Sequence, residues 1–143
     1  MTTAASPILL HAERLTAGYG KMAILHDVTL DVRAGEMVSV IGPNGAGKST
    51  AFKTMVGFLR PTSGRVLFDG EDITGLRPDQ VLPRGLAYVP QGRIVFPQMT
   101  VLENLEMGAY IERDGRRIQE ALERVYRLFP ILAERRTQKA GTM

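Results

Sequence analysis

The sequence contains no cysteine, which excludes disulfide bonds, thiolate metal ligands and a cysteine nucleophile. Its two histidines, His11 and His26, have no metal-binding spacing, so we interpret both as incidental strand or surface residues. No apolar run reaches the roughly 20 residues of a membrane-spanning helix, so any membrane association is expected to be peripheral. Residues 1–10 lack the basic and apolar regions of a secretory signal, which predicts a cytosolic protein.

A strong charge of either sign is also absent. The 18 Lys and Arg residues exceed the 15 Asp and Glu residues only slightly, and the net charge is +3. Such a surplus is typical of a solvated surface, and we expect no nucleic-acid partner from it. With 143 residues, of which 44% are hydrophobic, the chain is long enough for one domain with a buried core.

The first part of the chain is predicted to be rich in strands. Residues 8–10 and Leu15 are short apolar pieces, and residues 28–32 alternate apolar and polar side chains, as a half-buried antiparallel strand does. Residues 37–41 are nearly all apolar, which predicts a strand that is covered on both faces. Two further strands are expected, at residues 65–68 and 86–89.

Helices are predicted after residue 48 and in the last third of the chain. Apolar residues at helical spacing predict a helix over residues 49–59, followed by Pro61. Thr100 and Glu103 have the spacing of a capping box at the start of another helix. One apolar face runs along residues 118–129 and predicts a third helix.

Residues 42–49 match the pattern G-x-x-x-x-G-K-[ST] in full, between a predicted buried strand and a predicted helix. Glycines let the backbone N–H groups point at phosphate oxygens, and the helix start adds partial positive charge. Lys48 is predicted to reach the β- and γ-phosphates of a nucleotide, and Ser49 to bind Mg²⁺. The predicted nucleotide-binding residues of this loop are Gly42, Pro43, Asn44, Gly45, Ala46, Gly47, Lys48, Ser49 and Thr50.

Three segments together resemble the ATP-binding subunits of ABC transporters: GPNGAGKST, PTSGRVLFDGEDIT and YVPQGRIVFPQMTVLENLEMG. The resemblance covers the chain from Leu10 onward. Residues 91–97, 128–136 and 140–143 are most similar to the subunits of branched-chain amino acid importers. Urea and short-chain amide importers are similar in the first of these segments, so the substrate class is less specific than the family.

The resemblance implies an α/β fold, the N-terminal part of a P-loop NTPase cassette. It would comprise an antiparallel β subdomain, part of a RecA-like parallel sheet and the start of the helical subdomain. Within residues 1–143, the strand-rich part is expected at residues 8–69, with the phosphate loop at 42–50. Residues 86–143 are expected to hold the glutamine loop and the helical subdomain.

Two residues outside the phosphate loop acquire predicted roles from the resemblance. Tyr19 matches the aromatic residue that stacks on adenine, although a tyrosine at a strand end on a sheet edge is the alternative. Gln91 matches the glutamine that contacts Mg²⁺ and the attacking water, because an amide both donates and accepts hydrogen bonds. The predicted cofactors are therefore ATP and Mg²⁺.

The family also implies partners and a location. Expected partners are transmembrane permease subunits, a second ATP-binding subunit in a homo- or heterodimer, and indirectly a periplasmic binding protein. The chain would lie peripherally on the cytoplasmic face of the membrane. Residues 93–107 are a candidate docking surface for the permease, and the alternative is a helical hairpin that closes its own core.

Three elements of the family pattern do not occur in this sequence: the Ser-Gly-Gly signature, an apolar strand that ends in Asp-Glu, and the later switch histidine. Phosphoryl transfer needs a positioned water and charge stabilisation at the γ-phosphate. We therefore expect ATP binding with little or no hydrolysis by the isolated chain, with Gln91 as the one candidate that senses water or Mg²⁺. The sequence would represent a truncated product, a fragment or a partial record.

Two other functions are open at this stage. One is a soluble ABC-type protein that acts on nucleic acid or ribosomes, but such a protein needs a basic surface with several phosphate contacts, which the weak charge disfavours. The other is a non-catalytic remnant that binds no nucleotide. A rise in thermal stability with ATP would distinguish a nucleotide-binding chain from that remnant.

Overall fold

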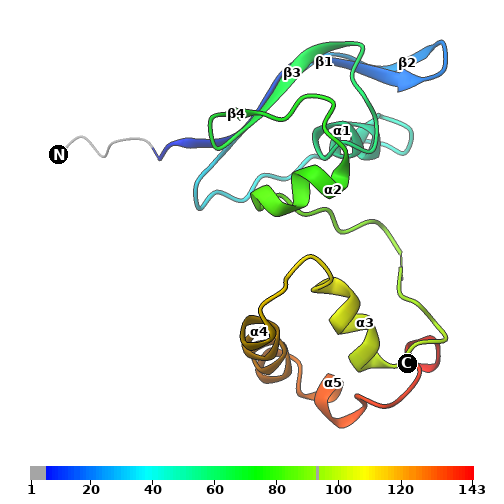
Figure 1. Cartoon of the computed structure of the whole chain (residues 1–143). Helices are drawn as coiled ribbons and strands as arrows, with labels where there is room; N and C mark the ends of the chain where they lie inside the picture. Colours follow the sequence, from blue (N-terminus) through cyan, green and yellow to red (C-terminus); the bar gives the residue numbers. More distant parts are fainter. Residues whose placement is uncertain (1–5, 93) are drawn as a thin grey trace. The chain divides into compact units, whose positions relative to one another are not determined.

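The computed structural model describes residues 6–92 and 94–143, which divide into two compact units between Tyr88 and Val89 (Figure 1). The elements of the first unit are β1 (Ile8–Tyr19), β2 (Met22–Arg33), α1 (Lys48–Met55), β3 (Ser63–Phe68), β4 (Glu71–Asp72), α2 (Pro78–Val81) and the 3-10 turn η1 (Leu82–Arg84). Those of the second are α3 (Val101–Gly108), α4 (Gly115–Leu128), α5 (Pro130–Glu134) and the 3-10 turn η2 (Ala140–Thr142). The division predicted at residues 69 and 86 stays a prediction.

The strands form one antiparallel sheet in the order β2-β1-β3-β4. The predicted strands at residues 28–32 and 65–68 are confirmed as parts of β2 and β3. The apolar pieces at residues 8–10 and Leu15 belong to a single strand, β1, which sequence reasoning had divided. The strand is irregular at Arg14, where φ is 45° and the backbone N–H donates to Thr29 Oγ1 at 3.0 Å.

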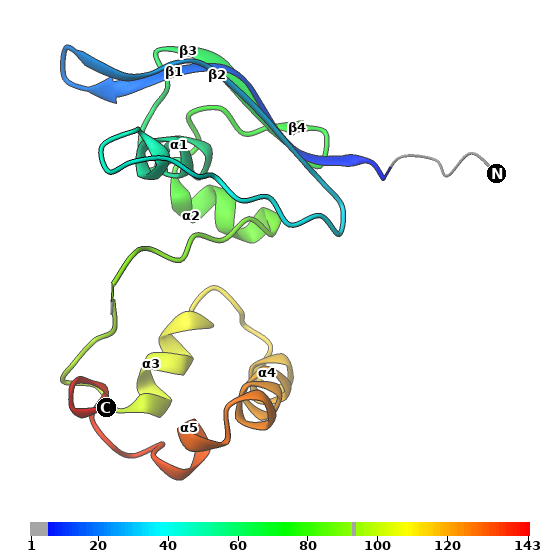
Figure 2. The same cartoon turned by 180° about the vertical axis from the view of Figure 1, so that it is seen from behind.

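Helices α1 and α2 lie on the same face of this sheet (Figures 1 and 2). The buried core between them and the strands consists of Ala12, Leu15, Met55, Val66, Phe68, Ile73 and Val81. Met55 ends α1 and is 5% exposed, so the helix is fixed to the sheet by its last residue. The segment that enters α1 is thereby fixed as well.

Residues 37–41 and 86–89 are not strands, contrary to the sequence-based prediction. A strand needs hydrogen-bonding neighbours, and within residues 6–92 and 94–143 neither segment has a ladder partner. The partial parallel sheet is therefore not formed by the described residues. Val38 and Val40 face a cavity of about 190 Å³ above the antiparallel sheet, whereas Met37 and Ile41 are each 93% exposed. The segment is thus covered on one face instead of two.

Helix α1 ends at Met55, although the apolar spacing predicted a helix to residue 59. The backbone becomes left-handed at Gly57, with φ 84°, and the N–H of Phe58 turns back to the carbonyl of Lys53 at 2.8 Å. An added Cβ at Gly57 would lie 2.0 Å from the carbonyl oxygen of Leu76. Contact with the chain before α2 therefore ends the helix, and this contact is invisible in a local pattern.

The second unit contains the predicted capping box. Thr100 Oγ1 accepts a hydrogen bond from the N–H of Glu103 at 3.2 Å, and the Glu103 carboxylate accepts one from the N–H of Thr100 at 2.7 Å. The helix predicted over residues 118–129 is α4, which begins three residues earlier behind the N-cap Asp114. Helix α4 contacts α5, which follows it directly in the chain, and no residue of either helix is fully buried.

Candidate functional site

The glycine loop at residues 42–47 leads directly into α1, as the motif requires. Gly47 is the N-cap residue and has φ 87° and ψ 0°, and Gly45 has φ 83°. An added Cβ at Gly47 would lie 3.0 Å from Leu25 Cδ2 and 3.4 Å from Ile24 Cγ2 in β2. Both the left-handed backbone and the close approach of β2 require glycine here. Strand β2 therefore packs against the loop at Gly47. The sequence did not predict this contact.

Several backbone N–H groups of the loop are available to a ligand. The N–H of Ala46 donates to the carbonyl of Pro43 at 3.3 Å, which closes a turn. In the part of the chain that the structure describes, the N–H groups of Gly45, Gly47, Lys48 and Ser49 have no hydrogen-bond acceptor. The last three are at the start of α1, where the helix dipole adds partial positive charge. A set of free N–H donors at a helix start is a suitable binding place for a phosphate group.

The ammonium group of Lys48 folds over the loop. Its Nζ donates to the carbonyl oxygens of Gly42 and Pro43, each at 2.7 Å. These bonds hold the cation beside the free N–H groups even without an anion. A phosphate oxygen carries more negative charge than a carbonyl oxygen and is the stronger acceptor for an ammonium donor.

The two hydroxyl residues after Lys48 have different environments. Ser49 is exposed at the first turn of α1, where its hydroxyl is open to a ligand or ion. Thr50 is 7% exposed, and its carbonyl accepts a hydrogen bond from Thr54 Oγ1 at 2.8 Å. Thr50 thus packs the helix against the core in this structure, and its predicted contact with nucleotide stays a prediction.

The remaining predicted site residues are not part of the loop. Tyr19 ends β1 at the hairpin to β2 and is 52% exposed, so its ring is accessible. Gln91 is exposed in the second unit, and its role stays a prediction. Arg93, the first residue of the predicted docking surface, lies outside the described residues.

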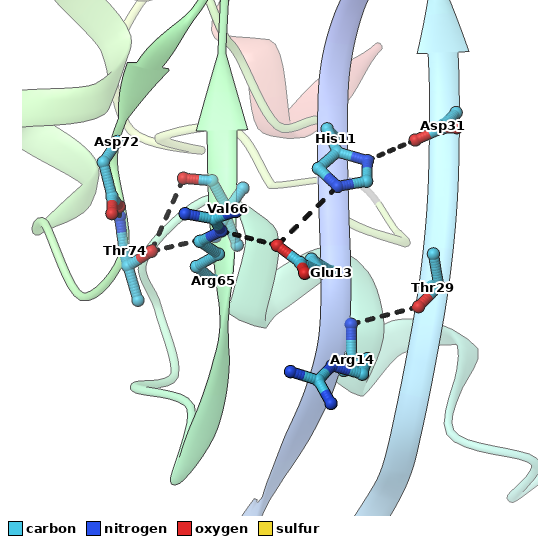
Figure 3. A network of polar contacts seen from close by, with 9 residues as sticks. All are labelled: His11, Glu13, Arg14, Thr29, Asp31, Arg65, Val66, Asp72 and Thr74. Atoms are coloured by element: carbon cyan, nitrogen blue, oxygen red, sulfur yellow. Dashed lines mark hydrogen bonds and ion pairs between the residues drawn. The ribbon is translucent and has the colours of Figure 1, made fainter.

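A polar network crosses the outer part of the sheet (Figure 3). Arg65 on β3 donates to the Glu13 carboxylate on β1, and this hydrogen bond lowers the pKa of Glu13. His11 lies between Asp31 on β2 and Glu13. Two hydrogen bonds from Thr74 lower the pKa of Asp72: the hydroxyl has the larger effect and the backbone N–H the next. These contacts join β2, β1 and β3. In residues 6–92 and 94–143 no group of acidic, histidine or cysteine side chains could hold a metal ion.

An α/β unit in which a G-x-x-x-x-G-K-[ST] loop opens a helix belongs to the P-loop class of proteins. Within this class the chain belongs to the ABC transporter family, whose family model matches residues 25–143. The predicted family and the α/β P-loop cassette fold are confirmed, whereas the described residues form only the antiparallel part of the predicted sheets. The structure has no helix, among its described residues, that is long and apolar enough to cross a membrane.

Similar proteins include ATP-binding proteins of several transport systems. The chain is 42% identical over 136 residues to the high-affinity branched-chain amino acid transport ATP-binding protein BraG of Pseudomonas aeruginosa, covering 94% of this chain and 58% of the relative. It is 38% identical over 135 residues to the probable branched-chain amino acid transport protein LivF of Archaeoglobus fulgidus, covering 94% and 57%. The lipopolysaccharide export protein LptB of Haemophilus influenzae is 41% identical over 106 residues, covering 74% and 44%.

Solved structures agree with this assignment. A nucleotide-free ATP-binding cassette of an ABC transporter superposes with a TM-score of 0.80 at 28% identity, covering 96% of this chain and 59% of that one. An ATP-binding cassette in its ADP conformation gives a TM-score of 0.79 at 29% identity, with the same coverage. The chain thus spans a little more than half the length of the two branched-chain relatives and of these two cassettes.

Proposed function

We propose that this chain binds ATP through its glycine loop as part of the ATP-binding subunit of a branched-chain amino acid importer. The observation that carries the proposal is the loop itself: free N–H groups and the Lys48 ammonium converge at the start of α1. The triphosphate would take the place of the Gly42 and Pro43 carbonyls as acceptor for Lys48. Adenine would stack on the exposed ring of Tyr19.

The residues present also fit Mg²⁺. Ser49 offers an exposed hydroxyl next to Lys48 in the chain, and a hydroxyl is a hard oxygen ligand of the kind that Mg²⁺ prefers. Mg²⁺ keeps several waters and binds through few protein groups plus the substrate phosphates. We therefore propose that Ser49 binds the ion only together with the nucleotide, and the role of Gln91 as a metal ligand remains what the family resemblance implies.

Calorimetric titration of the 143-residue chain with Mg-ATP tests the proposal. Lys48→Ala removes the ammonium that bridges the loop, and Lys53→Ala removes the same charge five residues later in α1, away from the loop. We expect saturable binding by the parent chain and Lys53→Ala, and none by Lys48→Ala. Absence of binding by the parent chain would contradict the proposal and would favour a remnant without nucleotide.

The substrate class rests on the extent of the similarity. The branched-chain relatives match 94% of this chain, whereas the lipopolysaccharide exporter matches 74% at nearly equal identity. We propose permease subunits, a second ATP-binding subunit and, indirectly, a periplasmic binding protein as partners, on the cytoplasmic face of the membrane. Restored uptake of branched-chain amino acids by a strain that lacks its own subunit, on expression of the full-length gene, would support this.

The apolar side chains of Ile94, Val95 and Phe96 are 71%, 47% and 53% exposed. Their exposure favours a docking surface in the described part of the predicted segment, residues 94–107.

Hydrolysis is a separate matter. We propose that the isolated 143-residue chain turns over ATP slowly or not at all, because the apolar strand that ends in Asp-Glu in the family does not occur in its sequence. Phosphate release that Lys48→Ala abolishes would contradict this. No observation favours a nucleic-acid function.

A further inference from the structure

The turn at residues 96–100, which precedes α3, is bound on one side by the side chain of Asn104. Its Oδ1 accepts a hydrogen bond from the N–H of Phe96 at 2.8 Å, and its Nδ2 donates to the carbonyl of Phe96 at 3.0 Å. Both backbone groups of Phe96 are therefore bound by one carboxamide. Nδ2 also donates to the carbonyl of Thr100 at 2.9 Å and lies 3.4 Å from that of Met99. The amide of Asn104 thus spans the whole turn from Phe96 to Thr100.

The other side of this turn binds the last residues of the chain. The N–H of Ala140 donates to the carbonyl of Met99 at 2.9 Å, and the N–H of Gly141 donates to that of Pro97 at 3.1 Å. An added Cβ at Gly141 would lie 2.8 Å from Pro97 Cβ, so the two segments are in direct contact. The turn at residues 96–100 therefore lies between Asn104 on α3 and residues 140–141.

An asparagine is chemically required for this arrangement. The side chain must accept one hydrogen bond and donate to two or more carbonyl oxygens at the same time. An aspartate of the same shape could accept from Phe96 but would place a negative charge beside three carbonyl oxygens. The carboxamide of Asn104 binds both backbone groups of Phe96, whose carbonyl also accepts a hydrogen bond from the N–H of Met99 at 3.1 Å.

We propose that Asn104 is a positioning residue for the candidate docking surface at residues 94–107. It fixes the backbone of Phe96, at the end of the exposed apolar residues 94–96. It thereby fixes the position of this segment relative to residues 140–141. The functional meaning rests on the proposed permease docking. The mechanical part, a link from α3 through the turn to residues 140–141, stands on the hydrogen bonds alone.

Amide hydrogen exchange, resolved by residue with NMR on the 143-residue chain, tests the link. In Asn104→Asp we expect protection at Phe96, Ala140 and Gly141 to fall by about tenfold or more, while the amides of α4 keep theirs. Glu106→Ala is the matched control, because Glu106 is exposed on the same helix and its side chain makes no hydrogen bond or ion pair within the described residues. This variant is expected to leave all of these amides unchanged.

A second variant tests the order of the link and serves if Asn104→Asp does not fold. Gly141→Ala places a methyl group against Pro97, so we expect loss of protection at Ala140 and Gly141 with Phe96 still protected. Equal loss at Phe96 would overturn the proposal. So would unchanged protection at Ala140 and Gly141 in Asn104→Asp, or equal loss throughout α4, which would mean that Asn104 only stabilises the unit. Failure of the parent chain to bind Mg-ATP would overturn the proposed function and leave these results in place.

Discussion

Gly47 lies against Leu25, with only 3.0 Å between the position of an added Cβ and Leu25 Cδ2. The contact joins the phosphate loop to β2, a strand that ends well before the loop in sequence. Leu25 is 4% exposed and cannot move aside without disturbing the core. The shape of the loop is therefore set by the sheet as well as by its own glycines.

Gly47→Ala is expected to destabilise the first unit by about 1–3 kcal/mol, since a side chain at φ 87° is strained and also meets Leu25. We expect it to abolish Mg-ATP binding as well, because the N–H groups at the start of α1 would be displaced. Denaturant unfolding and calorimetry measure the two effects.

Gly70→Ala serves as the control for Gly47→Ala. Its φ is 79°, yet nothing lies within 4 Å of an added Cβ, so it adds backbone strain without crowding. We expect a smaller loss of stability, about 1 kcal/mol, with nucleotide binding retained. Equal effects of the two variants on binding would show that the contact with Leu25 is irrelevant.

Tyr19→Ala is expected to weaken Mg-ATP binding about tenfold or more, since stacking of a base on an aromatic ring contributes roughly 1–3 kcal/mol. Tyr19→Phe keeps the ring and should bind nearly as well as the parent chain. Inorganic triphosphate has no base, so its affinity should be the same in all three proteins. A loss of triphosphate binding in Tyr19→Ala would place the effect in the loop instead of at the adenine.

The capping box predicts that the stability of the second unit depends on pH. Two hydrogen bonds from Thr100 lower the pKa of Glu103 from its ordinary value of 4.5: the backbone N–H has the larger effect and the hydroxyl the next. The folded state therefore binds protons less readily at Glu103 than the unfolded state does. The stabilisation is complete above the ordinary pKa and is lost as the pH falls through the lowered one.

Unfolding measured between about pH 3 and pH 6 checks this dependence. Glu103→Gln should flatten it in that range. Thr100→Ala removes the cap itself and is expected to cost roughly 0.5–2 kcal/mol at neutral pH. An unchanged pH profile in Glu103→Gln would assign the dependence to other carboxylates.

Leu15→Ala is expected to destabilise the first unit by roughly 2–5 kcal/mol, because Leu15 is 1% exposed at the centre of the core. Met37→Ala removes a larger side chain that is 93% exposed and should change stability little. Thermal unfolding followed by a probe in each unit measures both variants. A similar loss of stability in the two variants would contradict the placement of Leu15 in the buried core.

Local signals predicted the local features well. The capping box of Thr100 and Glu103 involves residues three apart, and the glycine loop is continuous in sequence, so both could be predicted without a structure. Residues 37–41 show the limit of such reasoning. Their composition indicates a strand, but a strand exists only with a partner, and the described residues supply none.

Long-range contacts explain the other differences. β1 continues through Arg14 because Thr29 of the neighbouring strand binds its N–H, which alternation of apolar residues cannot reveal. The support of Gly47 by Leu25 and the bonds from Asn104 to Phe96 also join separate elements. The asparagine in Thr-Val-Leu-Glu-Asn, four residues after the N-cap, was the available signal for the last of these.

The Lys48 ammonium is already satisfied by the Gly42 and Pro43 carbonyls before any nucleotide arrives. On the proposed function, a phosphate that binds Lys48 would have to displace these two carbonyl oxygens. The net affinity contributed by Lys48 is a difference between two sets of oxygen acceptors.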